Sequence, residues 1–205
     1  MTKKYELTTE TKVVGGKTLY RIKALIAFRD VHAGDVGGFV ESDTNLSHDG
    51  NAWVYDDAKV YDDAKVYGNA WVSGNAGVSG NAEVYGNAKV YDNAKVYDNA
   101  WVSGNAEVSG NAEVYGNAWV YGNAKVYGNA GVAGKAIATK AVLNVGYEKY
   151  NITATDRHLK IGCKQYTFDE WVNFDDGTIS RMDDGALVWW KKWKPIIFAI
   201  LEVKV

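Results

Sequence analysis

Histidine and cysteine, two residue types that often act as catalytic groups or zinc ligands, are scarce in this sequence. The 205-residue chain has three histidines, His32, His48 and His158, and a single cysteine, Cys163. A structural zinc site needs a compact set of Cys and His ligands, which these scattered residues do not provide. One cysteine also cannot form an internal disulfide, so the sequence favours a reducing compartment. We therefore expect neither a bound metal nor a cofactor.

The side chains that could bind a partner instead belong to a repeat. From Asn51 to Gly134 the chain divides into hexads of the form Asn-Ala-x-Val-Tyr-Gly, without one insertion. Ala and Val are two residues apart, so on an extended strand both point inward, while x and the following Tyr or Ser point outward. The remaining Gly, Asn and Asp residues are typical of turns. Each hexad therefore predicts a short strand and one corner of a solenoid.

The outward residues indicate how many hexads complete one coil. Residues in register on adjacent coils become neighbours, where opposite charges and aromatic pairs stabilise by roughly 0.2–1 kcal/mol and like charges destabilise. One hexad per coil places Lys59 on Lys65, and two hexads separate every Trp from every other Trp. Three hexads, or 18 residues, place Trp53 on Trp71 without any like-charge pair. The same register pairs Lys65 with Glu83, Lys89 with Glu107, Lys95 with Glu113, Glu107 with Lys125, and Trp101 with Trp119. The sequence thus predicts a triangular prism with three short strands per coil.

This pattern resembles the left-handed parallel β-helix of hexapeptide-repeat proteins. Their repeat has an aliphatic residue followed four positions later by a small one, as Val54 and Ala58 are here. The resemblance implies a left-handed sense and a homotrimer with clefts between subunits. Many such proteins are acyltransferases that use a histidine base and an inserted loop. No loop and no histidine interrupts these hexads, so His48 is a weak catalytic candidate, and a structural histidine under the N-terminal cap is its alternative.

The flanking segments predict two caps. Residues 1–30 contain two strand-like runs around Gly15-Gly16, typical of a β-hairpin. Residues 31–146 form the predicted β-helix, including a degenerate first coil. Residues 147–205 form a small C-terminal α+β cap with two strands, NITATD and RHLKIGC, and a helix that begins at the capping box Thr167–Glu170. A second helix follows, which Pro195 should kink or restart.

Longer segments resemble uncharacterised β-solenoid proteins encoded in phages and prophages, which carry a Trp-rich C-terminal module. The matching stretches are LYRIKAL, GDVGGFVES, NLSHDGNAWVYD, IGCKQYTFDEW and RMDDGALVWWKKWKPIIFAI. This resemblance implies a phage origin and a role inside an infected bacterial cell. It brings no established activity.

Outward-facing rings and charges are the candidate binding residues. Aromatic side chains with a polar tip suit interfaces and planar ligands, although they also cover a thin core. The candidates for ligand or partner binding are Trp53, Trp71, Trp101, Trp119, Tyr91, Lys89 and Lys125. In the C-terminal module, Trp189, Trp190, Trp193 and Ile197 either form an oligomerisation face or make up the core of the cap.

Charge and hydropathy restrict the partners. The formal net charge of −2 gives no general attraction for a nucleic acid duplex. The longest apolar run, Ile196–Leu201, is far shorter than the ~20 residues that span a bilayer, and the start lacks the apolar stretch of a signal peptide, so we expect a cytoplasmic protein without membrane contact. The sequence favours a non-enzymatic, homotrimeric, phage-encoded binding protein. Such a counter-defence or host-takeover factor would sequester a small nucleotide-like ligand or inhibit a host protein. An acyltransferase and a structural virion or scaffold protein are the alternatives.

Overall fold

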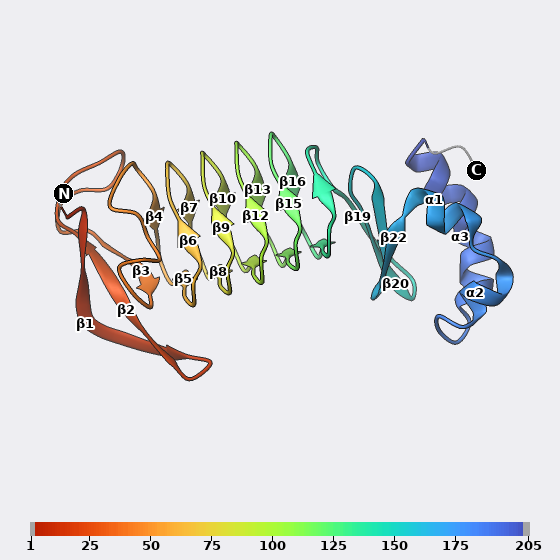
Figure 1. Cartoon of the computed structure of the whole chain (residues 1–205), viewed down its shortest axis with the longest axis horizontal. Helices are drawn as coiled ribbons and strands as arrows, with labels where there is room; N and C mark the ends of the chain where they lie inside the picture. The colour runs from red at the N-terminus through yellow and green to blue at the C-terminus, as the bar shows by residue number, and fades with distance from the viewer. Residues whose placement is uncertain (1–2, 203–205) are drawn as a thin grey trace.

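The computed structural model describes residues 3–202 and shows stacked coils between two caps (Figure 1). Parallel pairing joins each solenoid strand to the strand 18 residues further along, as Trp53 with Trp71 and Val54 with Val72. Asn51 Nδ2 likewise donates to Asn69 Oδ1 at 3.0 Å across one coil. The predicted β-solenoid with three hexads per coil is therefore confirmed.

Three sheets form the sides of the solenoid, and their strands pair in parallel except where β2 pairs with β1 and β3. The first sheet has the order β1-β2-β3-β5-β8-β11-β14-β17, the second β16-β13-β10-β7-β4, and the third β18-β15-β12-β9-β6. The strands of the first sheet are β1 (Tyr5–Val14), β2 (Lys17–Ala24), β3 (Val36–Val40), β5 (Lys59–Val60), β8 (Gly77–Val78), β11 (Lys95–Val96), β14 (Glu113–Val114) and β17 (Gly131–Val132). Those of the second are β4 (Trp53–Val54), β7 (Trp71–Val72), β10 (Lys89–Val90), β13 (Glu107–Val108) and β16 (Lys125–Val126). Those of the third are β6 (Lys65–Val66), β9 (Glu83–Val84), β12 (Trp101–Val102), β15 (Trp119–Val120) and β18 (Ile137–Ala138).

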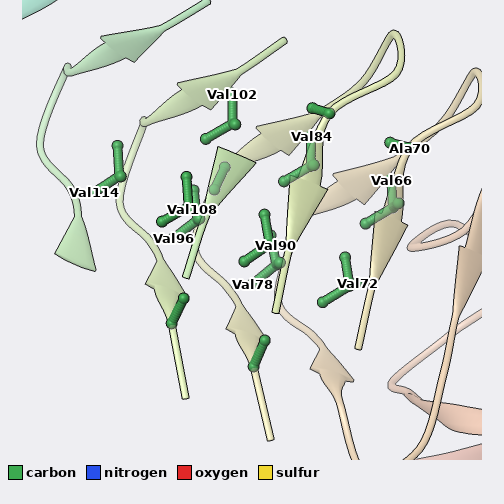
Figure 2. Packing of buried hydrophobic residues seen from close by; sticks show 14 of the residues in the cluster. Val66, Ala70, Val72, Val78, Val84, Val90, Val96, Val102, Val108 and Val114 are labelled. Carbon is green, nitrogen blue, oxygen red and sulfur yellow. The ribbon is translucent and has the colours of Figure 1, made fainter. Parts of the chain in front are cut away.

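The core is a narrow column of alanine and valine. Every Ala and Val at the two inward hexad positions is buried, and Figure 2 shows the valines of successive coils pointing into the interior. The corners turn through residues with positive φ, such as Asp92 at 61° and Gly74 at 66°. Gly and Asp tolerate this conformation better than bulkier residues do. The hexad thus supplies both the core and the corners.

Most of the predicted contacts between coils are present. The Nζ atom of Lys89 lies 3.3 Å from Glu107 Oε1, and that of Lys95 lies 3.2 Å from Glu113 Oε1. Glu107 also pairs with Lys125, whose Nζ lies 3.7 Å from Oε2. The predicted pair of Lys65 and Glu83 is in register, but the Glu83 carboxylate accepts a hydrogen bond from the Tyr67 hydroxyl at 2.7 Å. The Tyr67 hydroxyl therefore competes with the Lys65 ammonium for the Glu83 carboxylate.

The N-terminal hairpin covers the first coil. β1 and β2 pair antiparallel around Gly15-Gly16, as predicted, and β2 continues onto β3. Buried side chains of the hairpin, including Tyr5 and Ile22, join the solenoid core. The far end of the hairpin runs beneath the first coils (Figure 1), where Lys17 pairs with Asp62.

The C-terminal cap combines an antiparallel sheet with helices. Its sheet contains β19 (Leu143–Tyr147), β20 (Tyr150–Ala154), β21 (His158–Ile161) and β22 (Lys164–Thr167). Its helices are α1 (Phe168–Asn173), α2 (Asp176–Ser180) and α3 (Ala186–Ile200), and the predicted capping box at the start of α1 is confirmed. Pro195 lies inside α3, which does not restart there. Packing of Trp190, Ile197 and Phe198 into the cap core outweighs the missing backbone hydrogen bond. No helix within residues 3–202 combines the length and apolar character needed to cross a membrane.

Candidate functional site: a groove at an empty position of the solenoid

The outward side chains of successive coils stack into ladders. Tyr97 and Tyr115 are parallel within 1°, with ring centroids 5.0 Å apart. Tyr67 and Tyr85 stack in the same way at 4.9 Å, because the coil repeat places equivalent side chains directly above one another. We call the two outward residues of one solenoid strand a rung, so that Lys95 and Tyr97 form one rung of the first sheet.

Where serine replaces tyrosine, a large neighbour usually fills the rung. Ser73 shares a rung with Trp71, whose ring contacts Tyr55 edge-on at 5.7 Å. Ser103 shares a rung with Trp101, which contacts Tyr85 edge-on at 6.5 Å. A third such rung holds Ser109 and Glu107, and that glutamate is paired with lysines of both adjacent coils.

The rung of Gly77 and Ser79 has no such filling. A Cβ atom placed on Gly77 would have no neighbouring atom within 4 Å. The comparable rung of Gly131 and Ala133 is covered by the C-terminal cap, since a Cβ on Gly131 would lie 2.5 Å from Lys160 Nζ, and Gln165 Nε2 donates to the Ala133 carbonyl at 2.7 Å. The C-terminal cap thus covers the rung of Gly131 and Ala133, whereas the rung of Gly77 and Ser79 stays open.

The open rung forms the floor of a groove of about 540 Å³ on the first sheet. Tyr61 lies on the coil before Ser79 and Tyr97 on the coil after it, and both line the groove. Because one coil advances ~4.8 Å, a planar ring at the level of Ser79 would lie within stacking distance of both tyrosines. We call this site the Gly77 groove and define it by Lys59, Tyr61, Gly77, Ser79, Lys95 and Tyr97.

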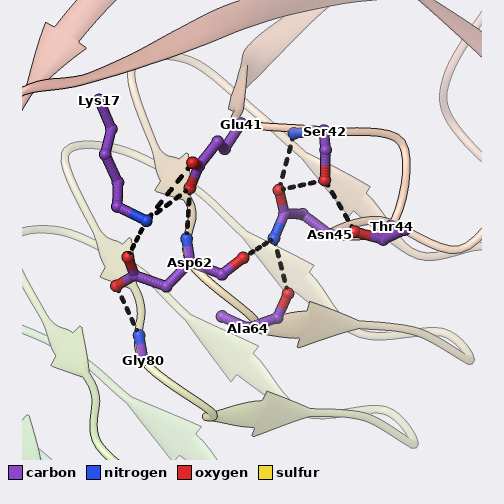
Figure 3. A network of polar contacts seen from close by, with 8 residues as sticks. All are labelled: Lys17, Glu41, Ser42, Thr44, Asn45, Asp62, Ala64 and Gly80. Carbon is purple, nitrogen blue, oxygen red and sulfur yellow. Dashed lines mark hydrogen bonds and ion pairs between the residues drawn. The ribbon is translucent and has the colours of Figure 1, made fainter.

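The N-terminal hairpin fixes one rim of the groove. Lys17 Nζ on β2 pairs with Asp62, and it also donates to Glu41 Oε2 at 3.2 Å (Figure 3). Asp62 in turn accepts from the Gly80 amide at 2.9 Å, and its own amide donates to Glu41 at 2.7 Å. The hydrogen bond from Lys17 lowers the pKa of the Asp62 carboxyl. This network ties the corner at Asp62 to the corner at Gly80 on the next coil, and it pairs one of the acids that line the groove with Lys17.

One cation that lines the groove is unpaired. Lys95 pairs with Glu113, whereas the Lys59 ammonium has no hydrogen bond or ion pair with any of residues 3–202. Partial burial, and then the neighbouring Lys12, lower the pKa of Lys59. A bound anion would favour the charged ammonium and so raise the pKa of Lys59. Burial also raises the pKa of Tyr97, helped by Glu113, so its phenol stays a neutral donor.

The binding residues predicted from the sequence lie on two other sheets. Trp71, Lys89, Tyr91 and Lys125 belong to the second sheet, where both lysines pair with Glu107. The indole of Trp71 contacts Tyr55, and Lys89 Nζ lies 5.5 Å from its ring centre. These residues form a compact ladder, and they share no groove with the tryptophans of the third sheet.

The remaining predicted tryptophans of the solenoid differ in exposure. Trp53 is 1% exposed, because the rings of Tyr5 and Phe28 pack against it. Trp101 and Trp119 on the third sheet are 37% and 46% exposed, and they stack within 3° at 5.1 Å. Trp53 therefore belongs to the core, while the other two form a surface strip with Tyr121 and Ile137.

His48 lies under the N-terminal cap, the structural role that was the alternative to a catalytic one. Its Nδ1 accepts a hydrogen bond from the Lys4 amide at 3.2 Å, and its ring stacks on Tyr5 at 4.3 Å. Among residues 3–202, no three His, Cys, Asp or Glu side chains gather closely enough to hold a metal ion.

The four candidate oligomerisation residues pack within the C-terminal cap. Trp189, Trp190 and Ile197 are buried in its core, and Trp193 packs against them and donates to Glu148 Oε2 at 3.1 Å. These positions agree with the alternative interpretation, in which the four residues make up the core of the cap.

Sequence reasoning missed the Gly77 groove, although a signal for it was present. Within the hexads before Gly131, NAGVSG at residues 75–80 is alone in having neither a ring nor a charge at its two outward positions. The functional candidates were sought among large side chains, whereas this site depends on their absence. Neither a scan of protein families nor a search of curated proteins finds a match to this chain.

Proposed function

We propose that this chain is a non-enzymatic binding protein that sequesters a small, planar, anionic ligand of nucleotide type in the Gly77 groove. One observation carries the proposal: a rung between Tyr61 and Tyr97 is empty, although the ladder continues on both sides. A nucleobase at the level of Ser79 would complete that ladder. Stacking of a base on an aromatic side chain contributes roughly 1–3 kcal/mol.

The charges of the groove support an anionic ligand. Lys59 is its unpaired cation. Of its acids, Asp62 and Glu113 pair with lysines, and Asp98 accepts a hydrogen bond from the Gly116 amide. A phosphate beside Lys59 would form a charge-assisted hydrogen bond, which is stronger than a neutral one. The groove volume of about 540 Å³ lies in the ordinary range of ligand pockets.

We further propose a homotrimer that buries the strip of Trp101, Trp119, Tyr121 and Ile137. These exposed side chains form one apolar surface along the third sheet, a type of surface that marks interfaces. The two indoles contact each other at 5.1 Å, which leaves no space for a planar ligand between them. Their outer edges therefore suit a protein surface, and a sister subunit offers the same flat side of a prism.

A stoichiometric binder of this kind fits the phage resemblance of the flanking segments. We propose that the protein is a left-handed hexapeptide-repeat solenoid encoded by a phage, which acts in the cytoplasm of the host bacterium as a counter-defence factor. The position of His48 beneath the hairpin gives no support to acyl transfer.

Native mass spectrometry with AMP, adenosine and ribose 5-phosphate tests the groove. AMP combines the ring with the phosphate, so we expect it to bind about tenfold more tightly than either fragment, one molecule per chain. Ser79→Tyr should complete the ladder and abolish AMP binding. Ser109→Tyr is the matched control, because it also adds a tyrosine between two others but on the second sheet. Undiminished AMP binding by Ser79→Tyr, or equal binding of all three compounds, would contradict the proposal.

The same spectra report the number of subunits. We expect trimers for the unmodified chain and monomers for Trp101→Lys combined with Trp119→Glu, since these changes create an opposite-charge ladder from Glu83 upward and keep the coil register. Tyr91→Ser on the second sheet should remain trimeric. A monomeric unmodified chain would refute the trimer, and it would leave the AMP result to stand by itself.

A further inference from the structure

The C-terminal cap contains a second cavity, about 340 Å³ in volume, with aromatic walls. It lies between the sheet edge near the β21–β22 turn and helices α1 to α3 (Figure 1). Its lining includes Tyr150, Trp171, Met182, Trp189 and Trp190. Small-molecule pockets typically have this size and apolar character, with a few polar groups that orient the ligand.

One buried polar atom in this lining lacks a partner. Trp189 is 7% exposed, and its Nε1 has no hydrogen-bond acceptor within residues 3–202. By contrast, Nε1 of Trp171 donates to the Leu159 carbonyl at 2.7 Å. A buried indole N–H usually finds an acceptor, so the unsatisfied group indicates a place for an acceptor atom of a ligand.

The charges around the cavity favour an anion. Asp183 is held by Lys149 at 2.8 Å and by the Tyr150 hydroxyl, and these hydrogen bonds lower the pKa of its carboxyl to about 2. Lys164 also lines the cavity, and its ammonium forms no hydrogen bond or ion pair with the described part of the chain. The acid is thus neutralised and the lysine is not.

We propose that this cavity is a binding site for a small aromatic anion, whose rings pack among the tryptophans and whose acidic group reaches Lys164. This site is independent of the Gly77 groove, because it lies in the C-terminal cap and shares no lining residue with it. It gives the cap a binding role in addition to covering the last coil.

Two dyes that differ in one group test the proposal. 8-Anilino-1-naphthalenesulfonate carries a sulfonate, and N-phenyl-1-naphthylamine has the same rings without it. We expect the sulfonate to bind one per chain and roughly ten- to a hundredfold more tightly than the neutral amine, measured by fluorescence titration. Cys163 lines the cavity and is the single cysteine of the chain, so bound dye should slow its alkylation by iodoacetamide.

Three variants identify the site. Lys164→Gln should remove the preference for the sulfonate and leave binding of the neutral dye unchanged, whereas Lys191→Gln, which breaks a surface pair with Asp176, should change neither. Ala186→Leu should fill the cavity and weaken both dyes. Ser79→Tyr should have no effect on either dye, which separates this result from the outcome for the groove.

Two results would overturn the inference. The first is equal affinity of the unmodified chain for both dyes, and the second is an alkylation rate of Cys163 that saturating sulfonate does not change. Should Ala186→Leu fail to fold, as judged by circular dichroism, the change of preference in Lys164→Gln still decides the question.

Discussion

At the scale of single residues, Lys4 shows how the first coil is closed. Its side chain is buried, and Nζ donates to the Ala52 carbonyl at 2.8 Å, where a first coil has no preceding coil to supply a donor. Burial lowers the pKa of Lys4 from 10.5 to about 8, against the opposing effect of Asp49. The folded state therefore releases the Lys4 proton more readily than the unfolded state does.

This difference predicts that stability rises with pH between about 8 and 10. In that window the unfolded chain binds more protons than the folded chain, so the free energy of unfolding increases, by at most about 1.4 kcal/mol per pH unit from one group. Urea titrations at pH 7.5, 8.5 and 9.5 should show the increase. Lys4→Met should flatten it, while Lys3→Met, at a surface pair with Asp43, should not. An identical pH dependence in both variants would exclude Lys4 as the cause.

Sequence reasoning at this scale found the ladder partners but not the Gly77 groove. The type of a residue predicted its register, as Lys89 and Glu107 show. Residue type did not predict which outward side chains are buried. Trp53 is buried because Tyr5 and Phe28, from a distant part of the chain, pack against it. Gly77 is open for the converse reason, since no other segment places an atom within 4 Å of a Cβ at this position.

At the scale of elements, the corners explain the alternation of Asp and Gly. At four corners, an Asp with positive φ accepts a hydrogen bond from the Gly amide one coil later, as Asp92 does from Gly110 at 3.0 Å. This bond offsets the strain of a side chain in the left-handed region. Another corner has glycine in successive coils, at Gly86, Gly104 and Gly122. Glycine has no Cβ and adopts positive φ without strain, so no such bond is needed.

Two glycines of the repeat should therefore respond oppositely to alanine. Gly104 has a φ of 67°, and an added Cβ would lie 2.9 Å from the Gly122 amide nitrogen, so Gly104→Ala should cost roughly 1–2 kcal/mol or more. Gly77→Ala should be neutral or stabilise by up to about 1 kcal/mol, because it restricts the unfolded chain without a clash. Urea unfolding of both variants measures the contrast.

A third variant isolates the role of the hydrogen bond at the corner. Gly104→Asp should lose less stability than Gly104→Ala, since its carboxylate can accept from the Gly122 amide as Asp92 does from Gly110. Equal losses for these two variants would show that the bond does not offset the strain.

The caps were predicted where local signals are strong. The hairpin at Gly15-Gly16 and the capping box at Thr167 follow from short-range backbone chemistry. The strand β19 was missed because residues up to 146 were assigned to the β-helix. The strand β22 and the helix α2 were missed because contacts with other elements of the cap hold them. Pro195 was expected to kink or restart this helix, and α3 continues through it without a restart, because packing outweighs the local rule.

At the scale of the whole molecule, the period of 18 residues makes each coil a separable unit. Each coil contacts its two neighbours through the same ladder of backbone bonds, such as Lys89 N to Ala106 O at 2.9 Å. The stability of such a stack is approximately a sum of unit and interface terms. Removal of one whole coil should then preserve the fold, whereas removal of any other length should not.

Deletion of residues 87–104 tests this additivity. The hexads before and after the cut remain in frame, and the new neighbours, Trp71 with Glu107 and Glu83 with Trp119, include no like charges. We expect a folded, cooperative protein with a lower melting temperature and, by small-angle scattering, a solenoid shorter by ~4.8 Å. Deletion of residues 87–103 turns every later Ala and Val outward, because a shift of one residue exchanges the two faces of a strand, and it should abolish the cooperative transition. If both deletions melted alike, the coil would not be the unit of folding, and the ladders that define the Gly77 groove would lose their structural basis.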